Sequence, residues 1–353
     1  MYSVFCSRSY AAERHLMAEK VRVALDAMGG DNAPGEQIKG AVEALKMTDN
    51  AEIILVGQEE VIRRELAKYT YDTSRISVRN ATEVIETGEP PVNAIRKKKD
   101  SSIVVAEKMI KAGEADGFVS SGSTGAVLVG GQLLVGRIKG VDRAALGILM
   151  PTLNGISLMI DCGANVDARP EHMIQFARMG AIYYKEMIGK ENPTVGLINI
   201  GVEEDKGNAL TKETYQRLKA CTDLNFIGNV EPRDVPAGAS DIYVTEAFAG
   251  NSILKTYEGT AGAMLKLIKQ AFMSSLKSKV GALLVKDALK DTLKMMDATE
   301  YGGAPLLGLN GLVCKTHGNA TYKEVSHAIV QCVNFTERHL TDKIRAAVSP
   351  DEQ

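Results

Sequence analysis

Two short segments of this chain combine glycine with hydroxyl or carboxylate residues in a way that suits anion binding. They are Asp26-Ala27-Met28-Gly29-Gly30-Asp31-Asn32 and Ser121-Gly122-Ser123-Thr124-Gly125. Paired glycines let backbone N–H groups approach an anion at the start of a helix, where the helix dipole favours negative charge. The alternative is a structural turn, in which Asp31, Asn32 or a hydroxyl caps the following helix. Both interpretations remain open from these residues alone.

Several familiar catalytic motifs are absent from the sequence. It contains no GxxxxGK[ST] phosphate loop, no strand-linked GxGxxG and no HExxH. The segment Gly155-Ile156-Ser157-Leu158-Met159 lacks the second glycine of a GxSxG nucleophile elbow. The five cysteines form no CxxC pair. Sites for ATP, a dinucleotide, zinc or a serine triad are therefore disfavoured.

One histidine and two basic segments are further candidates for function. His317 lies beside Gly318 after an apolar run, with core packing as the alternative. The run Arg96-Lys97-Lys98-Lys99 suits either a solvated helix C-terminus or docking of an acidic partner. Residues 260–297 have the pattern of a basic amphipathic helix. That helix would pack in the core, form a dimer contact, lie on an anionic membrane or receive an acidic carrier protein.

The elements that must position these residues alternate between short apolar runs and longer stretches of helical period. This alternation predicts βαβ units, a mainly parallel sheet and helices on both of its faces, in three α/β/α layers. Because ligands bind outside the carboxyl ends of such strands, the polar loops that follow them should converge on one site. The predicted strands are 21–25, 52–56, 117–119, 156–160, 195–199, 224–227, 241–244 and 312–315.

Length and composition limit the remaining possibilities. We expect residues 20–347 to form a single large α/β catalytic unit, or two lobes that share a sheet, after a flexible leader or vector-derived remnant at 1–19. The formal charge of −2 argues against a general nucleic-acid binder. The sequence has no run of about 18 apolar residues and no signal-peptide pattern. A reduced cytoplasmic location fits best.

In number and order, several motifs resemble those of the PlsX family, the phosphate acyltransferases that start bacterial phospholipid synthesis. In two loops the chain departs from the usual family pattern, at Ser121 and Ser123 and at Glu246, Ala247 and Ala249. The resemblance runs from about Val21 to beyond Gly318. It rests on the segments 26–32, 95–102, 162–167 and 197–201 with Glu203, Lys206 and Gly207, on 248–251 with 254–255 and 258–259, and on 301–308.

The resemblance implies a fold similar to those of isocitrate and isopropylmalate dehydrogenases and of phosphotransacetylase, with a helical extension at about 260–297. It also implies a homodimer with no metal or other cofactor, loosely associated with the membrane. The partners it implies are acyl carrier protein, inorganic phosphate and, downstream, a glycerol-3-phosphate acyltransferase, with no nucleic acid.

The reaction that the resemblance implies is attack of a phosphate oxygen on the thioester carbonyl of acyl carrier protein, which yields an acyl phosphate and a free thiol. Phosphate is anionic at neutral pH, so the protein must orient the reactants and supply donors to the developing oxyanion rather than activate a nucleophile. The acidic residues are expected mainly to orient cations and loops. We assign catalytic roles to Asn199, Lys206, Asn229, Asn251, Lys255 and His317, and substrate or phosphate binding to Asp26, Gly29, Gly30, Asp31, Asn32, Gly122, Ser123, Thr124, Gly125, Asp161, Gly163, Asn165, Gly201, Glu203 and Gly250.

Two other classes of protein compete with this interpretation. A dehydrogenase of the isocitrate or isopropylmalate type would share the fold that the resemblance implies. It would need an aspartate cluster for a metal and contacts to a nucleotide, neither of which the sequence reveals. The second alternative is a non-catalytic scaffold that binds carrier protein and membrane.

Overall fold

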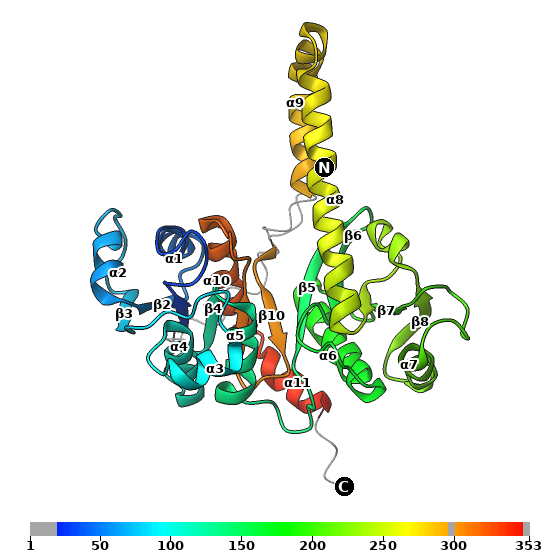
Figure 1. Cartoon of the computed structure of the whole chain (residues 1–353), viewed down its shortest axis with the longest axis horizontal. Helices are drawn as coiled ribbons and strands as arrows, with labels where there is room; N and C mark the ends of the chain where they lie inside the picture. Colours follow the sequence, from blue (N-terminus) through cyan, green and yellow to red (C-terminus); the bar gives the residue numbers. More distant parts are fainter. Residues whose placement is uncertain (1–19, 296–300, 349–353) are drawn as a thin grey trace, which may run out of the picture.

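One sheet of eleven strands runs through the whole molecule, in the order β3-β2-β1-β4-β11-β10-β5-β6-β9-β7-β8 (Figure 1). The computed structural model describes residues 20–295 and 301–348, so the predicted leader at 1–19 lies outside the described residues. The strands are β1 (Val21–Asp26), β2 (Ala51–Gly57), β3 (Ile76–Asn80), β4 (Gly117–Ser120), β5 (Ala145–Thr152), β6 (Gly155–Ile160), β7 (Thr194–Ile198), β8 (Asn225–Val230), β9 (Ile242–Val244), β10 (Ala304–Leu307) and β11 (Leu312–Lys315).

The sheet consists of two parallel groups with an antiparallel centre. Strands β3, β2, β1, β4 and β11 are parallel to one another, and so are β6, β9, β7 and β8. Between the groups, β10 is antiparallel to both β11 and β5, and β5 is antiparallel to β6. Three reversals separate the groups, which therefore run in opposite directions. The prediction of a mainly parallel sheet is confirmed, and its antiparallel centre is an addition.

Helices cover both faces of the sheet, as the three-layer prediction requires. One face packs against α1 (Gly35–Met47), α2 (Glu59–Leu66), α6 (Pro170–Ile188), α7 (Ala209–Ala220), α10 (Tyr322–Glu337) and α11 (Leu340–Val348). The second face packs against α3 (Pro91–Lys97), α4 (Ser102–Ala112), α5 (Thr124–Gly130) and the π-helix η1 (Gly131–Val135) over the first parallel group. Over the other group it packs against the 3-10 helix η2 (Pro232–Ala237) and the start of α8 (Ala247–Met273). The basic run at 96–99 does lie at a helix end, that of α3.

A helical hairpin projects from the body of the protein (Figure 1). The predicted helical stretch at 260–297 is divided between α8 and α9 (Leu276–Met295), with Ser274 capping the end of α8. Large apolar side chains on both helices are exposed, and Leu283 and Leu284 are 73% and 81% exposed. The body of the protein therefore leaves the apolar residues of this hairpin largely uncovered.

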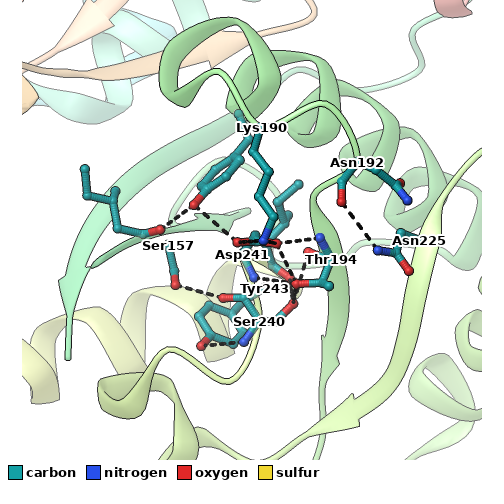
Figure 2. Close-up of polar contacts among 11 residues, drawn as sticks. Ser157, Lys190, Asn192, Thr194, Asn225, Ser240, Asp241 and Tyr243 are labelled. Carbon is teal, nitrogen blue, oxygen red and sulfur yellow. Dashed lines mark hydrogen bonds and ion pairs between the residues drawn. The ribbon is translucent and has the colours of Figure 1, made fainter. Parts of the chain in front are cut away.

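The amino ends of β7 and β9 are tied together by a network centred on Asp241 (Figure 2). Its carboxylate accepts hydrogen bonds from the Lys190 ammonium at 2.7 and 2.8 Å and from the backbone N–H and hydroxyl of Thr194 at 2.6 and 2.7 Å. Ser240 adds a bond from its hydroxyl to the Thr194 carbonyl and accepts one from Ser157. Although burial alone would raise the pKa of Asp241, the bonds from Lys190 and Thr194 lower it. This carboxylate therefore stabilises the second parallel group in its ionised form.

The substitution Asp241→Asn tests this network. We expect it to lower the free energy of unfolding by about 1–3 kcal/mol at neutral pH, because Lys190 and Thr194 lose a charged acceptor that is itself largely buried. The wild-type contribution is present above the unfolded pKa of about 3.9 and is lost as the pH falls through the lowered folded value. Urea unfolding at several pH values measures this. The difference between the two proteins should shrink in acid, whereas a constant difference would contradict the assignment.

Exposed Asp205, in the same half of the protein, gives the matched control. Asp205→Asn makes the same chemical change where no carboxylate network exists, so the free energy of unfolding should stay within about 0.5 kcal/mol of wild type.

Candidate active site

Three polar side chains form a row across adjacent strands at the carboxyl end of the first parallel group. Asp26 ends β1, Ser120 ends β4 and Lys315 ends β11, and the strand register places Lys315 beside Ser120. Side chains alternate between the two faces along a strand. The residues two positions earlier, Ala24, Phe118 and Val313, belong to the core under α4 and α5, so the row lies on that face of the sheet.

Asp26 organises the loop after β1. Its carboxylate is fully buried and accepts hydrogen bonds from the Ser120 hydroxyl at 2.7 Å and the Met28 N–H at 3.1 Å. Burial raises the pKa of Asp26, and hydrogen bonds from Ser102 and Ser120 oppose that shift. A methyl group at Gly29 would lie 2.2 Å from the Asp26 carboxylate, so only glycine fits there. This agrees with the expectation that Asp26 orients loops.

The glycine loop after β1 lies against the loop after β11. Gly30 has a φ of 103°, and a methyl group there would lie 2.8 Å from Ser121 and 2.9 Å from the Gly318 carbonyl. The Asp31 N–H donates to that carbonyl at 2.7 Å, and the Asn32 amide donates to the Asn319 carbonyl at 3.2 Å. Gly122 is also close, since its backbone would lie 2.8 Å from a methyl group placed on Gly29. The structure therefore brings together the predicted residues of three loops.

Asp161 organises the loop after β6, as Asp26 organises the loop after β1. Its buried carboxylate accepts hydrogen bonds from the N–H groups of Leu146, Gly163, Ala164 and Asn165 and from the Asn165 amide, all between 2.7 and 3.1 Å. Burial raises its pKa, and these donors oppose the shift. With its acceptor sites used in this way, Asp161 holds the loop that contains Gly163 and Asn165.

The first turn of α8 is fixed to this loop. The Ala247 N–H donates to the Asn165 carbonyl at 3.0 Å, and a methyl group at Gly250 would lie 2.1 Å from the Asp161 carbonyl. Glu246 caps the helix by accepting from the N–H groups of Phe248 and Ala249. The close approach at Gly250 sets where Asn251, the next residue, and Lys255, just over one turn further along the helix, lie.

A cavity of about 510 Å³ opens between these two sets of loops. Its polar lining includes Thr124 and Gly125 from the first group, and Gly163, Asn251 and Lys255 from the second. Its apolar lining comes from the central strands and the adjoining helices. The remaining lining residues are Leu128, Leu146, Ile148, Leu149, Cys162, Leu254, Tyr301, Gly302, Gly303, Ala304, Lys315, Thr316, His317, Gly318 and Glu324.

His317 links the two sides of the cavity. Its Nδ1 is 2.9 Å from the Glu324 carboxylate on α10, and its Nε2 is 3.2 Å from the Glu258 carboxylate on α8. The hydrogen bonds to Glu258 and Glu324 raise the pKa of His317 to about 9, although burial opposes the shift. The bond from His317, together with Lys255, lowers the pKa of Glu258 to about 2. His317 is therefore a cation at neutral pH, in contrast to the core-packing alternative.

The predicted residues after β7 and β8 form a separate group. The Asn199 amide donates to the Lys206 carbonyl at 3.1 Å, and the Asn229 amide donates to the Glu203 carbonyl at 2.8 Å. A methyl group at Gly201 would lie 2.9 Å from the Glu203 carboxylate. The first bond closes the loop between β7 and α7, and the second ties that loop to Asn229 within β8. The catalytic and binding roles assigned to this group stay predictions.

Sequence reasoning missed three residues that line or border the cavity, namely Lys315, Glu258 and Glu324. The capping alternative considered for the 121–125 segment is observed at Ser123, whose hydroxyl accepts from the Ala126 N–H at 3.4 Å. Glu324 and Lys315 are buried charged residues, a class that is rarely buried unless paired or functional. Burial of Lys315 follows from its place at the end of a central strand, which the sequence pattern 312–315 does predict.

The described residues limit what else the site can hold. Within residues 20–295 and 301–348, no three His, Cys, Asp or Glu side chains are grouped so that they could hold a metal ion. In the same part of the chain, no helix is long and apolar enough to span a bilayer.

Comparisons with known proteins agree with the fold and the sequence motifs. A phosphotransacetylase from Streptococcus pyogenes has a similar fold, with a TM-score of 0.57 and 18% identity over 91% of this chain and 95% of its own. A branched-chain phosphotransacylase from Enterococcus faecalis gives a TM-score of 0.53 and 12% identity over 91% of this chain and 99% of its own. At these identities the comparison shows the fold alone.

Closer relatives are found in sequence. A protein named phosphate acyltransferase from Clostridium novyi is 48% identical over 93% of this chain and 98% of its own length. Another of that name, from Desulfitobacterium hafniense, is 49% identical over 92% of this chain and 97% of its own length. Fold, cavity and relatives together define an α/β transacylase. The chain belongs to the family described as fatty acid synthesis protein, whose model matches residues 21–343.

The charge state of His317 can be measured directly. In wild-type protein its ring should titrate with a pKa of about 9, and Glu258→Gln should lower that value because one of its two carboxylate partners loses its charge. NMR titration of the histidine ring protons measures this, with His317→Gln assigning the signal. A pKa near 6.5 in wild-type protein would contradict the structure.

The same contact has a defined effect on stability. Because the folded pKa is raised, the contribution of His317 is fully present below the unfolded pKa of about 6.5 and is lost as the pH rises through about 9. The melting temperature of wild-type protein should therefore fall more over that range than that of His317→Gln.

Proposed function

We propose that this protein transfers a fatty acyl group from the thioester of acyl carrier protein to inorganic phosphate, which gives an acyl phosphate for phospholipid synthesis. The observation that carries the proposal is the cavity, which joins a polar, cationic end to an apolar floor in one enclosure. The names of the sequence relatives support it, since they are phosphate acyltransferases at 45–49% identity over most of the chain.

We place the acceptor, inorganic phosphate, at the polar end of the cavity. Phosphate is an anion at neutral pH and attacks the carbonyl carbon without a base to activate it, so the site needs to bind and orient it. Lys255 and protonated His317 supply positive charge there, and Thr124 and Asn251 supply hydrogen-bond donors. The attack forms an oxygen–carbon bond and breaks the carbon–sulfur bond, so that the thiol of the carrier leaves.

The acyl chain belongs over the apolar floor. Leu146, Ile148 and Leu149 of β5, Leu128 of α5 and Leu254 of α8 line that part of the cavity. Burial of apolar surface stabilises a bound chain by roughly 25 cal/mol per Å². This end of the cavity therefore favours a hydrophobic acyl group over a short acetyl group.

The remaining roles concern the helical hairpin and the partners. We propose that α8 and α9 contribute a contact in a homodimer and a peripheral contact with the cytoplasmic face of the membrane, near a downstream glycerol-3-phosphate acyltransferase. The support is the set of exposed apolar side chains, which stand among lysines that suit an anionic surface. The roles assigned to Asn199, Lys206 and Asn229 also remain proposals, because these residues do not line the cavity and their amides bond to the carbonyls of Lys206 and Glu203.

The primary test measures the free thiol of the carrier. With acyl carrier protein loaded with a long acyl chain, the purified protein should release thiol only when phosphate is added. Acyl phosphate should appear in equal amount, detected by its reaction with hydroxylamine. Thiol release at the same rate without phosphate would indicate a hydrolase instead, and no release under any condition would indicate the non-catalytic scaffold.

The hairpin proposal has its own test. The double variant Leu283→Glu, Leu284→Glu places two charges on exposed side chains of α9 and should abolish flotation with anionic phospholipid vesicles, because charged groups do not enter the acyl region. Phosphate-dependent thiol release in solution should persist. Undiminished flotation would count against the membrane contact, and the substitution Thr292→Glu on the same helix serves as the control for added charge.

A further inference from the structure

Lys315 is a buried cation that its position in the fold places in the lining of the cavity. It is the last residue of β11, paired with Ser120 of β4 on one side and with Ala304 of β10 on the other. Its side chain lies on the same face as Val313, which packs under α4 and α5, whereas Cys314 belongs to the core on the opposite face. Lys315 is 7% exposed and lines the cavity.

The ammonium of Lys315 lacks a direct carboxylate partner. It donates a hydrogen bond to the Thr316 carbonyl, and no carboxylate of the described residues lies within 4.0 Å of it. The nearest acidic groups have other donors, since Glu324 accepts from the His317 N–H and ring, and Asp26 accepts from Ser120 and Met28. An ammonium carries three N–H donors, so at least part of its capacity faces the cavity.

Burial of such a group is costly unless a ligand compensates for it. A desolvated charge without a partner destabilises the protein or loses its proton. Here burial lowers the pKa of Lys315 to about 8. The negative charges of Glu324, Asp26 and Asp31 act to raise this pKa, and the positive charge of Lys255 acts to lower it. An anion in the cavity would complete the hydrogen bonding of the ammonium and restore its charge.

We propose that the Lys315 ammonium binds an oxygen of the acceptor phosphate, and that it distinguishes this tetrahedral anion from water in the cavity. The inference rests on the function proposed above and adds a specific residue to it. Thr316 and His317, which follow directly on the chain, also line the cavity, but the Thr316 hydroxyl bonds to Ser121 and the His317 ring nitrogens bond to Glu324 and Glu258.

The ionisation of Lys315 gives the proposal a signature that a structural role would not give. Above about pH 8 the wild-type ammonium of the empty site loses its proton, so phosphate affinity should decline there. An arginine at this position stays charged at every accessible pH. The other ionisable groups around it, namely Asp26, Asp31, Lys255, His317 and Glu324, are the same in both proteins. A difference between their pH profiles therefore reports on residue 315.

The experiment compares wild-type protein with Lys315→Met and Lys315→Arg. Methionine keeps a similar length and volume without the charge. The dissociation constant of inorganic phosphate is measured by calorimetry, and KM is measured separately for phosphate and for the acyl carrier thioester. We expect Lys315→Met to weaken phosphate binding by about 10-fold or more, as for loss of a charge-assisted hydrogen bond, and to leave KM for the thioester within about twofold. Lys315→Arg should retain phosphate binding and lose the decline near pH 8, so that only the loss of the His317 charge near pH 9 remains in its profile.

Exposed Lys212 on α7 provides the matched control, and Lys212→Met should match wild type in every measurement. Unchanged phosphate affinity in Lys315→Met would overturn the proposal. So would an equal rise in both KM values with a lowered melting temperature and no rescue by arginine, since that pattern belongs to a structural lysine.

The proposed function and the proposed role of Lys315 can be contradicted independently. If wild-type protein binds phosphate through Lys315 but releases no thiol, the proposed function is wrong and the anion site stands. If thiol release depends on phosphate but Lys315→Met behaves as wild type, the function stands and the role of Lys315 is wrong.

Discussion

The antiparallel strands β10 and β5 join two half-sheets that run in opposite directions, and this reversal decides where a cavity can form. Parallel neighbours need a crossover connection, usually a helix that covers a face of the sheet. The antiparallel pair β5 and β6 needs only the turn at Leu153 and Asn154. In the described part of the chain no helix connects β5 to β6 or β10 to β11, and Leu146, Ile148 and Ala304 line the cavity.

Two buried carboxylates then fix the loops on either side of that space. Asp26 receives its donors from the loops after β1 and β4, and Asp161 receives five N–H bonds from the loop after β6 and from β5. Each carboxylate is fully buried, and burial raises its pKa. A negative charge held in this way organises backbone donors, and the cations Lys255, Lys315 and His317 line the cavity between the two sets of loops.

The sequence predicted much of this architecture because hydrophobic periodicity follows burial. Strands such as β1 and β2 are buried on both faces and read as continuous apolar runs. It did not predict β5, which contains Pro151, or β10, which has four residues and contains Pro305, because proline argues against a strand. The edge strand β3 was also missed, since its exposed polar residues resemble a loop.

The candidate site was less predictable, because it depends on contacts between distant parts of the chain. Glycines that permit a close approach, such as Gly29 and Gly30, could be identified from their local pattern. The pairing of His317 with Glu258 could not, because the two are 59 residues apart and meet only when α8 crosses toward β11. The segments at the ends of β7 and β8 looked equivalent to the others in sequence, yet in the fold their asparagines bond to the loop between β7 and α7.

The length of α8 has a structural consequence. Asn251 and Lys255 in its first turns border the cavity, while its last turns carry exposed apolar residues in the hairpin. At a rise of about 1.5 Å per residue, Lys255 and Met273 are about 27 Å apart along one continuous helix. The cavity end of this helix is held by the close approach of Gly250 to the Asp161 carbonyl and by the bond between Glu258 and His317. The residues that border the cavity and the exposed apolar residues of the hairpin therefore belong to one continuous helix.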